Sequence, residues 1–307
     1  MKKIGIFSFD VETQSIIHNK LMDEVGFRIY NESIPYLLDL LDKYKVKATF
    51  FFTGEISRLI PDLIRMVFLR GHEVGSHGLL HEISRAFDVL DYKEQLTDLL
   101  ESKRILEDII NFPVISFRAP ALRVNNYTSQ ALINSGFLID SSISPQRFDL
   151  FLSFGNKYKF KRLFSPRKVY FTKEYSLFQR GNAPLIEVPL TSFFYPYVGN
   201  LLRLHPKLSI LIRNIFYYES MIFKKPIVFY MHPHEFLNGD DTLVETNRRV
   251  KNFVSFLLAD KLRQKLKLKN LGDNAFSLLE RELSFFSKND YDFITIRSYC
   301  EKIGFLK

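Results

Sequence analysis

Short apolar runs alternate with amphipathic segments over the first 140 residues, and this alternation limits the possible folds more than any other feature. Apolar runs predict strands, and apolar residues spaced three and four apart predict helices. Strands that alternate with helices form parallel sheets with crossover helices. The predicted strands are Lys3–Phe9, Ala48–Thr53, His72–Ser76, Val114–Arg118 and Phe137–Asp140, and the predicted helices are Ser33–Tyr44, Pro61–Leu69, Tyr92–Ile110 and Thr128–Asn134.

The pattern is less regular after residue 140. Residues 144–184 are rich in Phe, Lys and Arg without a clear period, which predicts either a functional irregular insertion or a small hairpin. Strand signals return at Leu185–Pro189, Ile227–Met231 and Phe293–Ile296, and Arg297–Ile303 predicts a closing helix. The sequence has no repeat and no Gly/Ser linker, so we expect a single domain over all 307 residues.

Composition excludes several classes of protein. Apolar residues make up 46% and charged residues 25%, which is typical of a globular chain and not of a disordered or collagen-like one. The single cysteine, Cys300, excludes an intramolecular disulfide and a CxxC motif, and it fits a reducing compartment. Two lysines precede the first apolar run, but this run meets Asp10 too soon for a signal peptide.

The charge balance favours an anionic partner. Lys and Arg number 43 against 34 Asp and Glu, a net charge of +9 that suits a phosphate-bearing substrate, a polyanion or an anionic membrane surface. Lys251–Lys269 is interpreted as the solvated face of an amphipathic helix, and because no nucleic-acid motif accompanies it we expect no nucleic-acid partner. Phe193–Phe223 predicts either a core helix pair or a patch that lies on a membrane surface.

Chemically capable side chains follow the predicted strands at their carboxyl ends. In a barrel of parallel strands these ends converge on one face, where βα-barrel enzymes have their active sites. The residues are Asp10 and Glu12 after the first strand, His77 and His81 after the third, Arg118, Asp140, and His232 with His234.

His77 and His81 are four residues apart, which on a helical turn places both imidazoles within reach of one ion. Two ordinary surface histidines are the alternative. Asp10 and Glu12 point to the same side of an extended strand. One carboxylate could complete a set of two His and one acid with an open position, as in catalytic zinc sites, and the other could accept a proton. A salt-bridge network at the strand end is the alternative.

Five segments in order resemble the motifs of the polysaccharide deacetylase family, the NodB-homology enzymes of carbohydrate esterase family 4. The resemblance runs from Ile4 to about Ile303. It implies a distorted (β/α) barrel, one divalent metal, usually Zn²⁺, and hydrolysis of a sugar N-acetyl group. The segments are Ser8-Phe-Asp-Val-Glu12, Ser76-His-Gly-Leu-Leu-His81, Phe117-Arg-Ala-Pro120, Asp140-Ser-Ser-Ile-Ser-Pro145 with Glu187-Val-Pro189, and Phe229-Tyr-Met-His-Pro233.

The resemblance implies a role for each matching residue. Asp10 corresponds to the catalytic base, His77 and His81 to metal ligands, and His232 to the acid that protonates the leaving amine. Arg118 corresponds to the arginine that orients the base, and we expect it to contact Asp10 in a bidentate geometry.

The chain departs from the family pattern at three positions. Val11 replaces the usual second Asp, and the Asp-Val-Glu form is similar to a branch in which the third residue serves as ligand. We therefore expect Glu12 to bind the metal, with Asp10 as the alternative. Gly78 replaces the common Ser or Thr between the histidines, and Ala121 replaces a tyrosine.

Three residues are assigned to substrate binding: Pro120, His234 and Asp140. For His234 the alternative is a packing role, and for Asp140 it is a structural one. Glu235 is expected to be structural and to bond backbone groups near the site.

The predicted function is that of a carbohydrate N-deacetylase, a metal-dependent hydrolase that acts on a sugar in a surface-polysaccharide or glycolipid precursor. The alternatives are a hydrolase of a non-sugar amide or formamide, with or without metal, and a non-catalytic glycan-binding barrel. Zinc is the first choice of metal, and cobalt, nickel and manganese also suit the ligands. The lack of a signal-peptide pattern predicts a cytoplasmic protein at the inner face of the membrane, with peripheral contact through Tyr195–Phe223.

Overall fold

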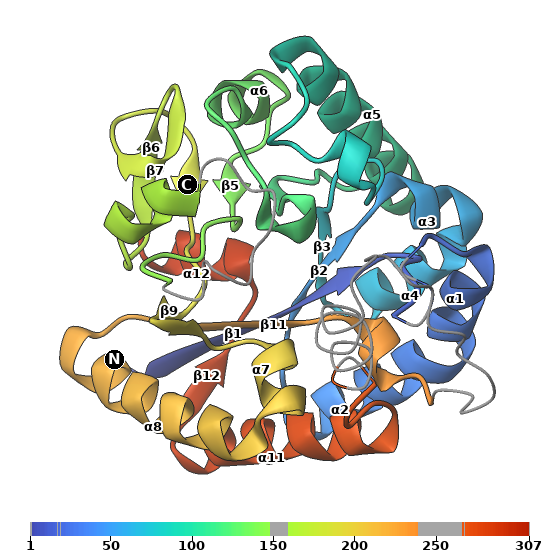
Figure 1. Ribbon diagram of the computed structural model, residues 1–307, viewed down its shortest axis with the longest axis vertical. Helices are drawn as coiled ribbons and strands as arrows, with labels where there is room; N and C mark the ends of the chain where they lie inside the picture. The colour runs from blue at the N-terminus through green and yellow to red at the C-terminus, as the bar shows by residue number, and fades with distance from the viewer. Residues whose placement is uncertain are drawn as a thin grey trace, which may run out of the picture.

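The computed structural model describes residues 2–16, 18, 20–147, 159–238, 266 and 268–306. Within these residues one sheet of ten strands has the order β11-β1-β2-β3-β4-β5-β8-β6-β7, and β12 pairs with β1 beside this path (Figure 1). Neighbouring strands from β11 to β8 all pair in parallel. Their bounds are β1 Lys3–Val11, β2 Thr49–Phe52, β3 Glu73–Ser76, β4 Ser116–Phe117, β5 Ile139–Asp140, β8 Ile186–Glu187, β11 Ile227–Met231 and β12 Tyr291–Phe293.

Helices cover the outside of the curled sheet, and the predicted distorted (β/α) barrel is confirmed (Figure 1). The predicted bounds of α4, α5 and α6 are met, and α2 is shorter than predicted by one residue at each end. Asp91 and Glu94 form a capping box that starts α5. The bounds are α2 Ile34–Lys43, α4 Pro61–Leu69, α5 Tyr92–Ile110, α6 Thr128–Asn134, α7 Gly199–Leu204, α8 Pro206–Phe223 and α12 Ile296–Lys302.

Among the described residues, three further α-helices lack a prediction. α1 (Asp23–Arg28) and α3 (Gly54–Leu59) have six residues each, too few to establish a period. α11 (Asp273–Lys288) buries residues of one face. The last predicted strand, Phe293–Ile296, is wrong except at Phe293, where β12 ends. Thr295 caps α12 by accepting a hydrogen bond from the backbone N–H of Ser298, and Ile296 begins this helix.

The predicted insertion contains a hairpin of β6 (Tyr170–Lys173) and β7 (Ser176–Arg180), and β6 joins the edge of the sheet antiparallel to β8. Residues 148–158 of the insertion, and 251–265 and 267 of the predicted basic helix, lie outside the described residues. No helix among the described residues is long and apolar enough to cross a membrane.

Phenylalanine side chains fill much of the core. Every residue of β2 is buried, and the ring centroids of Phe9 and Phe50 are 5.0 Å apart. Phe7 packs against Phe229 of β11 and Phe293 of β12. Burial of each such ring stabilises the fold by roughly 1.5–3 kcal/mol. The central strands are thereby held rigidly under the carboxyl-end face.

Candidate active site and metal centre

The predicted catalytic and metal-binding residues meet at the carboxyl ends of the parallel strands. Asp10 lies near the end of β1 and Glu12 follows it, whereas His77 follows β3. Arg118 follows β4 and His232 follows β11. Because β1 pairs with both β11 and β2, and β2 pairs with β3, residues far apart in the sequence face one space.

Glu12, His77 and His81 form a group whose ligand atoms all lie within 4.8 Å of one another. Glu12 Oε2 contacts His81 Nδ1 and lies 3.8 Å from His77 Nε2. Glu12 and His77 are buried, and His81 is largely so. Two imidazole nitrogens and one carboxylate oxygen make up the ligand set of catalytic zinc sites, which keep one position open. The arrangement favours Glu12 over Asp10 as the carboxylate ligand.

The hydrogen bonds and charges of this group suit a cation. Burial lowers the pKa of His77 and keeps its ring neutral, as a metal ligand must be. His77 Nδ1 lies 2.8 Å from the carbonyl oxygen of Arg118, which orients Nε2 toward Glu12. Burial opposes the charge on Glu12, but His81 and the other histidines outweigh it and lower the pKa of this carboxyl. Burial likewise opposes a charge on His81, and Glu12 raises its pKa overall, so a cation would compete with a proton there.

His77 and His81 lie on a loop, and the helical turn that their spacing suggested is wrong. Gly78 has a φ of +74°, and a Cβ there would lie 3.1 Å from the Phe87 ring. The carbonyl oxygen of Gly78 accepts a hydrogen bond of 2.9 Å from the backbone N–H of Gly54 at the start of α3. This left-handed turn brings the two imidazole centroids within 5.9 Å of each other and explains the glycine between the histidines.

Arg118 is completely buried and is held by three partners. Its Nη1 donates to Asp10 Oδ1 and to Ser8 Oγ, both at 2.8 Å. Its Nε and Nη2 donate to the carbonyl and hydroxyl oxygens of Ser141, both at 2.9 Å. The predicted bidentate contact with Asp10 is therefore wrong, because the serines take the other N–H groups. Arg118 still places a fixed positive charge beside the Asp10 carboxylate.

His232 is linked to a buried carboxylate that is linked in turn to an arginine. Its Nδ1 lies 2.9 Å from Glu235 Oε1, which also accepts from the His232 backbone N–H. Glu235 Oε2 pairs with Arg203 Nε. Burial disfavours the charged form of the His232 ring and lowers its pKa. The negative charges of Glu235, Glu12 and Asp10 outweigh this effect and raise the pKa of His232 to about 9. A raised pKa favours the protonated form of His232, which a general acid needs. As expected, Glu235 accepts a hydrogen bond from a backbone N–H group near the site. Its contact with the His232 ring is not among the predictions.

The residues assigned to substrate binding lie differently. The His234 ring stacks on His232 with a centroid distance of 4.9 Å, and burial lowers its pKa to about 3. Its substrate contact stays a prediction. Pro120 packs near Gly78 and is buried. Asp140 is also completely buried, and Ser142 Oγ donates to its Oδ1 at 2.6 Å. Substrate contacts by Pro120 and Asp140 stay predictions, and both side chains are buried.

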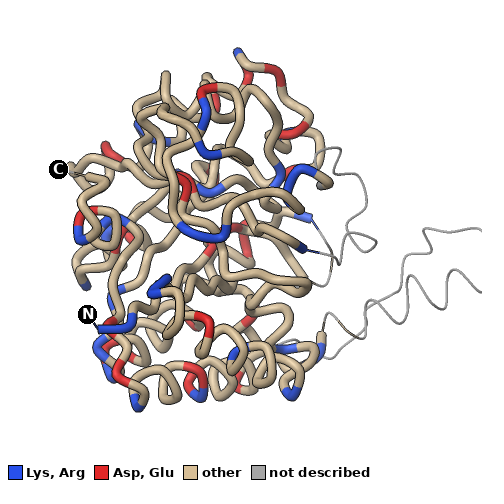
Figure 2. Tube along the Cα trace, turned by 90° about the vertical axis from the view of Figure 1, so that its left-hand side faces the viewer, with Lys and Arg blue, Asp and Glu red and all other residues tan. Residues whose placement is uncertain are grey.

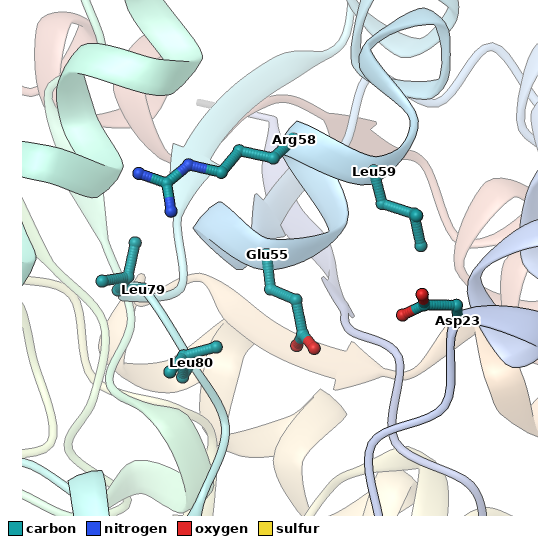
Figure 3. Close-up of a pocket in the computed structure, with 6 residues that line it drawn as sticks. All are labelled: Asp23, Glu55, Arg58, Leu59, Leu79 and Leu80. Atoms are coloured by element: carbon teal, nitrogen blue, oxygen red, sulfur yellow. The ribbon is translucent and has the colours of Figure 1, made fainter.

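A pocket of about 360 Å³ lies beside the ligand group, and no sequence pattern indicated it (Figure 3). Two of its leucines belong to the loop between His77 and His81. Glu55 Oε2 accepts a hydrogen bond of 3.1 Å from Thr13 Oγ1, next to Glu12 in the chain. Burial raises the pKa of Glu55. The lining residues are Asp23, Glu55, Arg58, Leu59, Leu79 and Leu80.

Residues 23–138 match the family model described as polysaccharide deacetylase. This part of the chain is thus similar to the polysaccharide deacetylase family. A peptidoglycan deacetylase from Helicobacter pylori is 32% identical over 145 residues, which are 47% of this chain and 46% of that protein. A peptidoglycan-N-acetylglucosamine deacetylase from Bacillus cereus is 33% identical over 103 residues, 34% of this chain and 46% of the relative. The chain thus matches about half the length of these curated relatives.

A similar fold over nearly the whole chain is found in a solved structure. The crystal structure of a Mycobacterium smegmatis protein assigned to these deacetylases is similar with a TM-score of 0.64 at 16% sequence identity. The similarity covers 99% of this chain and 91% of that one. At this identity the similarity shows the fold alone.

Proposed function

We propose that this chain is a metal-dependent hydrolase that removes the acetyl group from an N-acetylated amino sugar in a glycan. One observation carries the proposal: the group of Glu12, His77 and His81 lies at the same sheet end as the paired Asp10 and the protonated His232. The names of the curated relatives, which specify peptidoglycan and N-acetylglucosamine, support an N-acetylated glycan as the substrate class.

Each side chain has a defined task in the proposed reaction. A divalent metal, zinc as first choice, held by Glu12, His77 and His81 would supply a Lewis acid and lower the pKa of bound water. Asp10 accepts a proton from the attacking water, and Arg118 holds that carboxylate in place. His232 donates a proton to the leaving amine nitrogen, so that an uncharged amine departs.

The pocket beside the site supports a substrate larger than one acetylated sugar. It combines two carboxylates, which accept hydrogen bonds from sugar hydroxyls, with leucines that contact the apolar faces of sugar rings. We propose that a neighbouring sugar binds there. The net charge of +9 supports the further proposal that the sugar is part of a phosphate-bearing surface-polysaccharide or glycolipid precursor.

The test is acetate release by purified protein of known metal content, before chelation, after it, and after zinc is returned. Chitooligosaccharides, peptidoglycan fragments and UDP-N-acetylhexosamines are the substrates. We expect about one metal per chain and activity that chelation abolishes and zinc restores. Activity that survives complete metal removal would favour the metal-independent amide hydrolase, and a metal-loaded protein that releases no acetate from any of these glycans would contradict the proposal.

A further inference from the structure

The outer face of α8 is apolar. Leu211, Ile215, Tyr218 and Ile222 follow helical spacing and are 57%, 51%, 61% and 71% exposed. A surface helix ordinarily turns charged side chains to solvent. The inner face of α8 already packs into the core, so α8 is apolar on two sides. We call these four residues the α8 stripe.

Further exposed apolar side chains extend this surface. Phe223 at the end of α8 is 53% exposed, and Lys168 Nζ lies 5.9 Å from its ring centroid. Phe193 of β9 (Ser192–Phe193) is 42% exposed. Arg167 connects it to α8, because its guanidinium lies 4.8 Å from the Phe193 ring and 2.6 Å from Glu219. Contiguous exposed apolar surface of this kind marks an interaction site.

A basic pocket of about 210 Å³ adjoins the end of α8. Four lysines line it, and the lining residues that the structure describes include no acid. Lys2 and Lys224 are exposed, whereas Lys225 is buried and pairs with Glu219 at 2.7 Å. Figure 2 shows the N-terminus in a basic segment of the face toward the viewer, the left-hand side of Figure 1 where α8 lies. The lining residues are Lys2, Lys3, Ile4, Ser220, Met221, Lys224, Lys225, Pro226, Tyr299 and Ile303.

We propose that the α8 stripe and this basic pocket together are a docking surface for a bilayer that contains anionic phospholipids. The apolar side chains enter the boundary between headgroups and acyl chains, and the lysines bind lipid phosphates. Charge complementarity selects this occupant, because lysines flank the apolar surface and the carboxylate of α8 beside it, Glu219, is paired with Arg167 and Lys225. A second copy of the chain would bring the same lysines together.

Docking leaves the catalytic end of the sheet free. The pocket is lined by the start of β1 and by the residues before β11, whereas the ligand group follows the carboxyl ends of the strands. The inference does not depend on the proposed activity. Acetate release from a soluble chitooligosaccharide should be unchanged in every docking variant, so failure of docking and failure of the proposed function are distinguishable.

The test is cosedimentation of the full chain with vesicles of phosphatidylcholine alone and of phosphatidylcholine mixed with phosphatidylglycerol. We expect binding to the mixed vesicles that weakens with salt, and little binding to the neutral ones. Replacement of Lys2 and Lys224 by Gln should lower the partition coefficient roughly thirtyfold. Ile215→Glu with Ile222→Glu should lower it at least as far. Leu69→Glu is the control, because Leu69 is 82% exposed on α4.

Three results would overturn the proposal. The first is failure of the wild-type chain to bind the mixed vesicles. The second is unchanged binding in both double variants, or an equal loss in the Leu69→Glu control. The third is a dimer by light scattering that the Ile215/Ile222 variant dissociates, which would make this face an interface between copies. Thermal unfolding checks that the variants are folded, and their substituted side chains are exposed.

Discussion

Replacement of Glu235 by glutamine tests whether His232 sets the alkaline limit of the proposed reaction. Glu235 Oε1 lies 2.9 Å from His232 Nδ1 and, against the effect of burial, helps to raise the pKa of His232 to about 9. A raised pKa means that the protonated acid is present below about pH 9 and is lost as the pH rises through that value. The same proton stabilises the folded state fully below about pH 6.5, and this stabilisation is lost as the pH rises toward 9.

The size of the effect follows from the removed bond. A hydrogen bond to a charged group contributes roughly 1.5–3 kcal/mol, and about 1.4 kcal/mol corresponds to a tenfold change in proton affinity. Glu235→Gln should therefore lower the pKa of His232 from about 9 to roughly 7–8. Glutamine keeps an oxygen that can accept from the His232 backbone N–H, so the local backbone should hold.

Two assays measure this change. Nitrogen-15 NMR of the imidazole rings gives the titration of His232 in metal-free protein, and acetate release against pH gives the alkaline limb of the metal-loaded enzyme. Glu282→Gln is the matched control, because Glu282 is a buried carboxylate of α11 that lies 3.2 Å from Arg213. An alkaline limb that does not move in Glu235→Gln, or that moves equally in Glu282→Gln, would refute His232 as the acid.

Three further predictions concern the other site residues. His77→Ala and Glu12→Ala should each lose the metal, as measured by elemental analysis after dialysis. The control His205→Ala, at an exposed position before α8, should keep it. Full metal content in both site variants would reject the ligand group. Asp10→Asn should keep the metal but lower acetate release roughly 10²–10⁴-fold, and wild-type turnover would reject Asp10 as the base. Arg118→Met leaves the Asp10 carboxylate buried without its cation. The free energy of unfolding, measured in urea, should therefore fall by about 3–5 kcal/mol. An unchanged urea midpoint would contradict the structural importance of this pair.

Much of the architecture could be predicted because local signals coincide with the long-range packing. α5 has a capping box at its start and the left-handed Asn111 at its end, and a helical period lies between them. α1 and α3 could not be found, because six residues do not establish a period. Thr295 was assigned to a strand because a β-branched residue suits both a strand and a helix cap, and only the fold selects between them.

The site was predictable where its residues lie in short motifs and was not where they pair over long distances. His77, His81 and the Asp10/Glu12 pair are found from strand ends and spacing, and the choice of Glu12 as ligand came from the family resemblance. The partner of Glu235 is Arg203 of α7, 32 residues away, and no spacing rule indicates it. The helical-turn interpretation of the histidine pair failed because Gly78 adopts a left-handed conformation, which spacing alone does not reveal.

The pair of Asp140 and Glu187 illustrates how strand register determines charge. The two residues are opposite each other across β5 and β8, and both are completely buried. Asp140 Oδ2 and Glu187 Oε2 have no hydrogen-bond donor among the described residues. Burial raises the pKa of both carboxyls, and Asp140 adds to the effect on Glu187. One proton shared between them would give each of these oxygens a partner and would avoid the large cost of ionising two adjacent buried carboxylates.

This shared proton matters for Arg118. With both acids ionised, three buried carboxylates, including Asp10, would surround one guanidinium. With one proton shared, the pair carries a single negative charge, while the neighbouring Ser141 holds the Arg118 Nε and Nη2. Fewer negative charges then compete for the Arg118 guanidinium, so its attraction to the Asp10 carboxylate is kept. Each acid is visible in the sequence, but the charge state that preserves the Arg118–Asp10 pair arises from the register of two strands 47 residues apart.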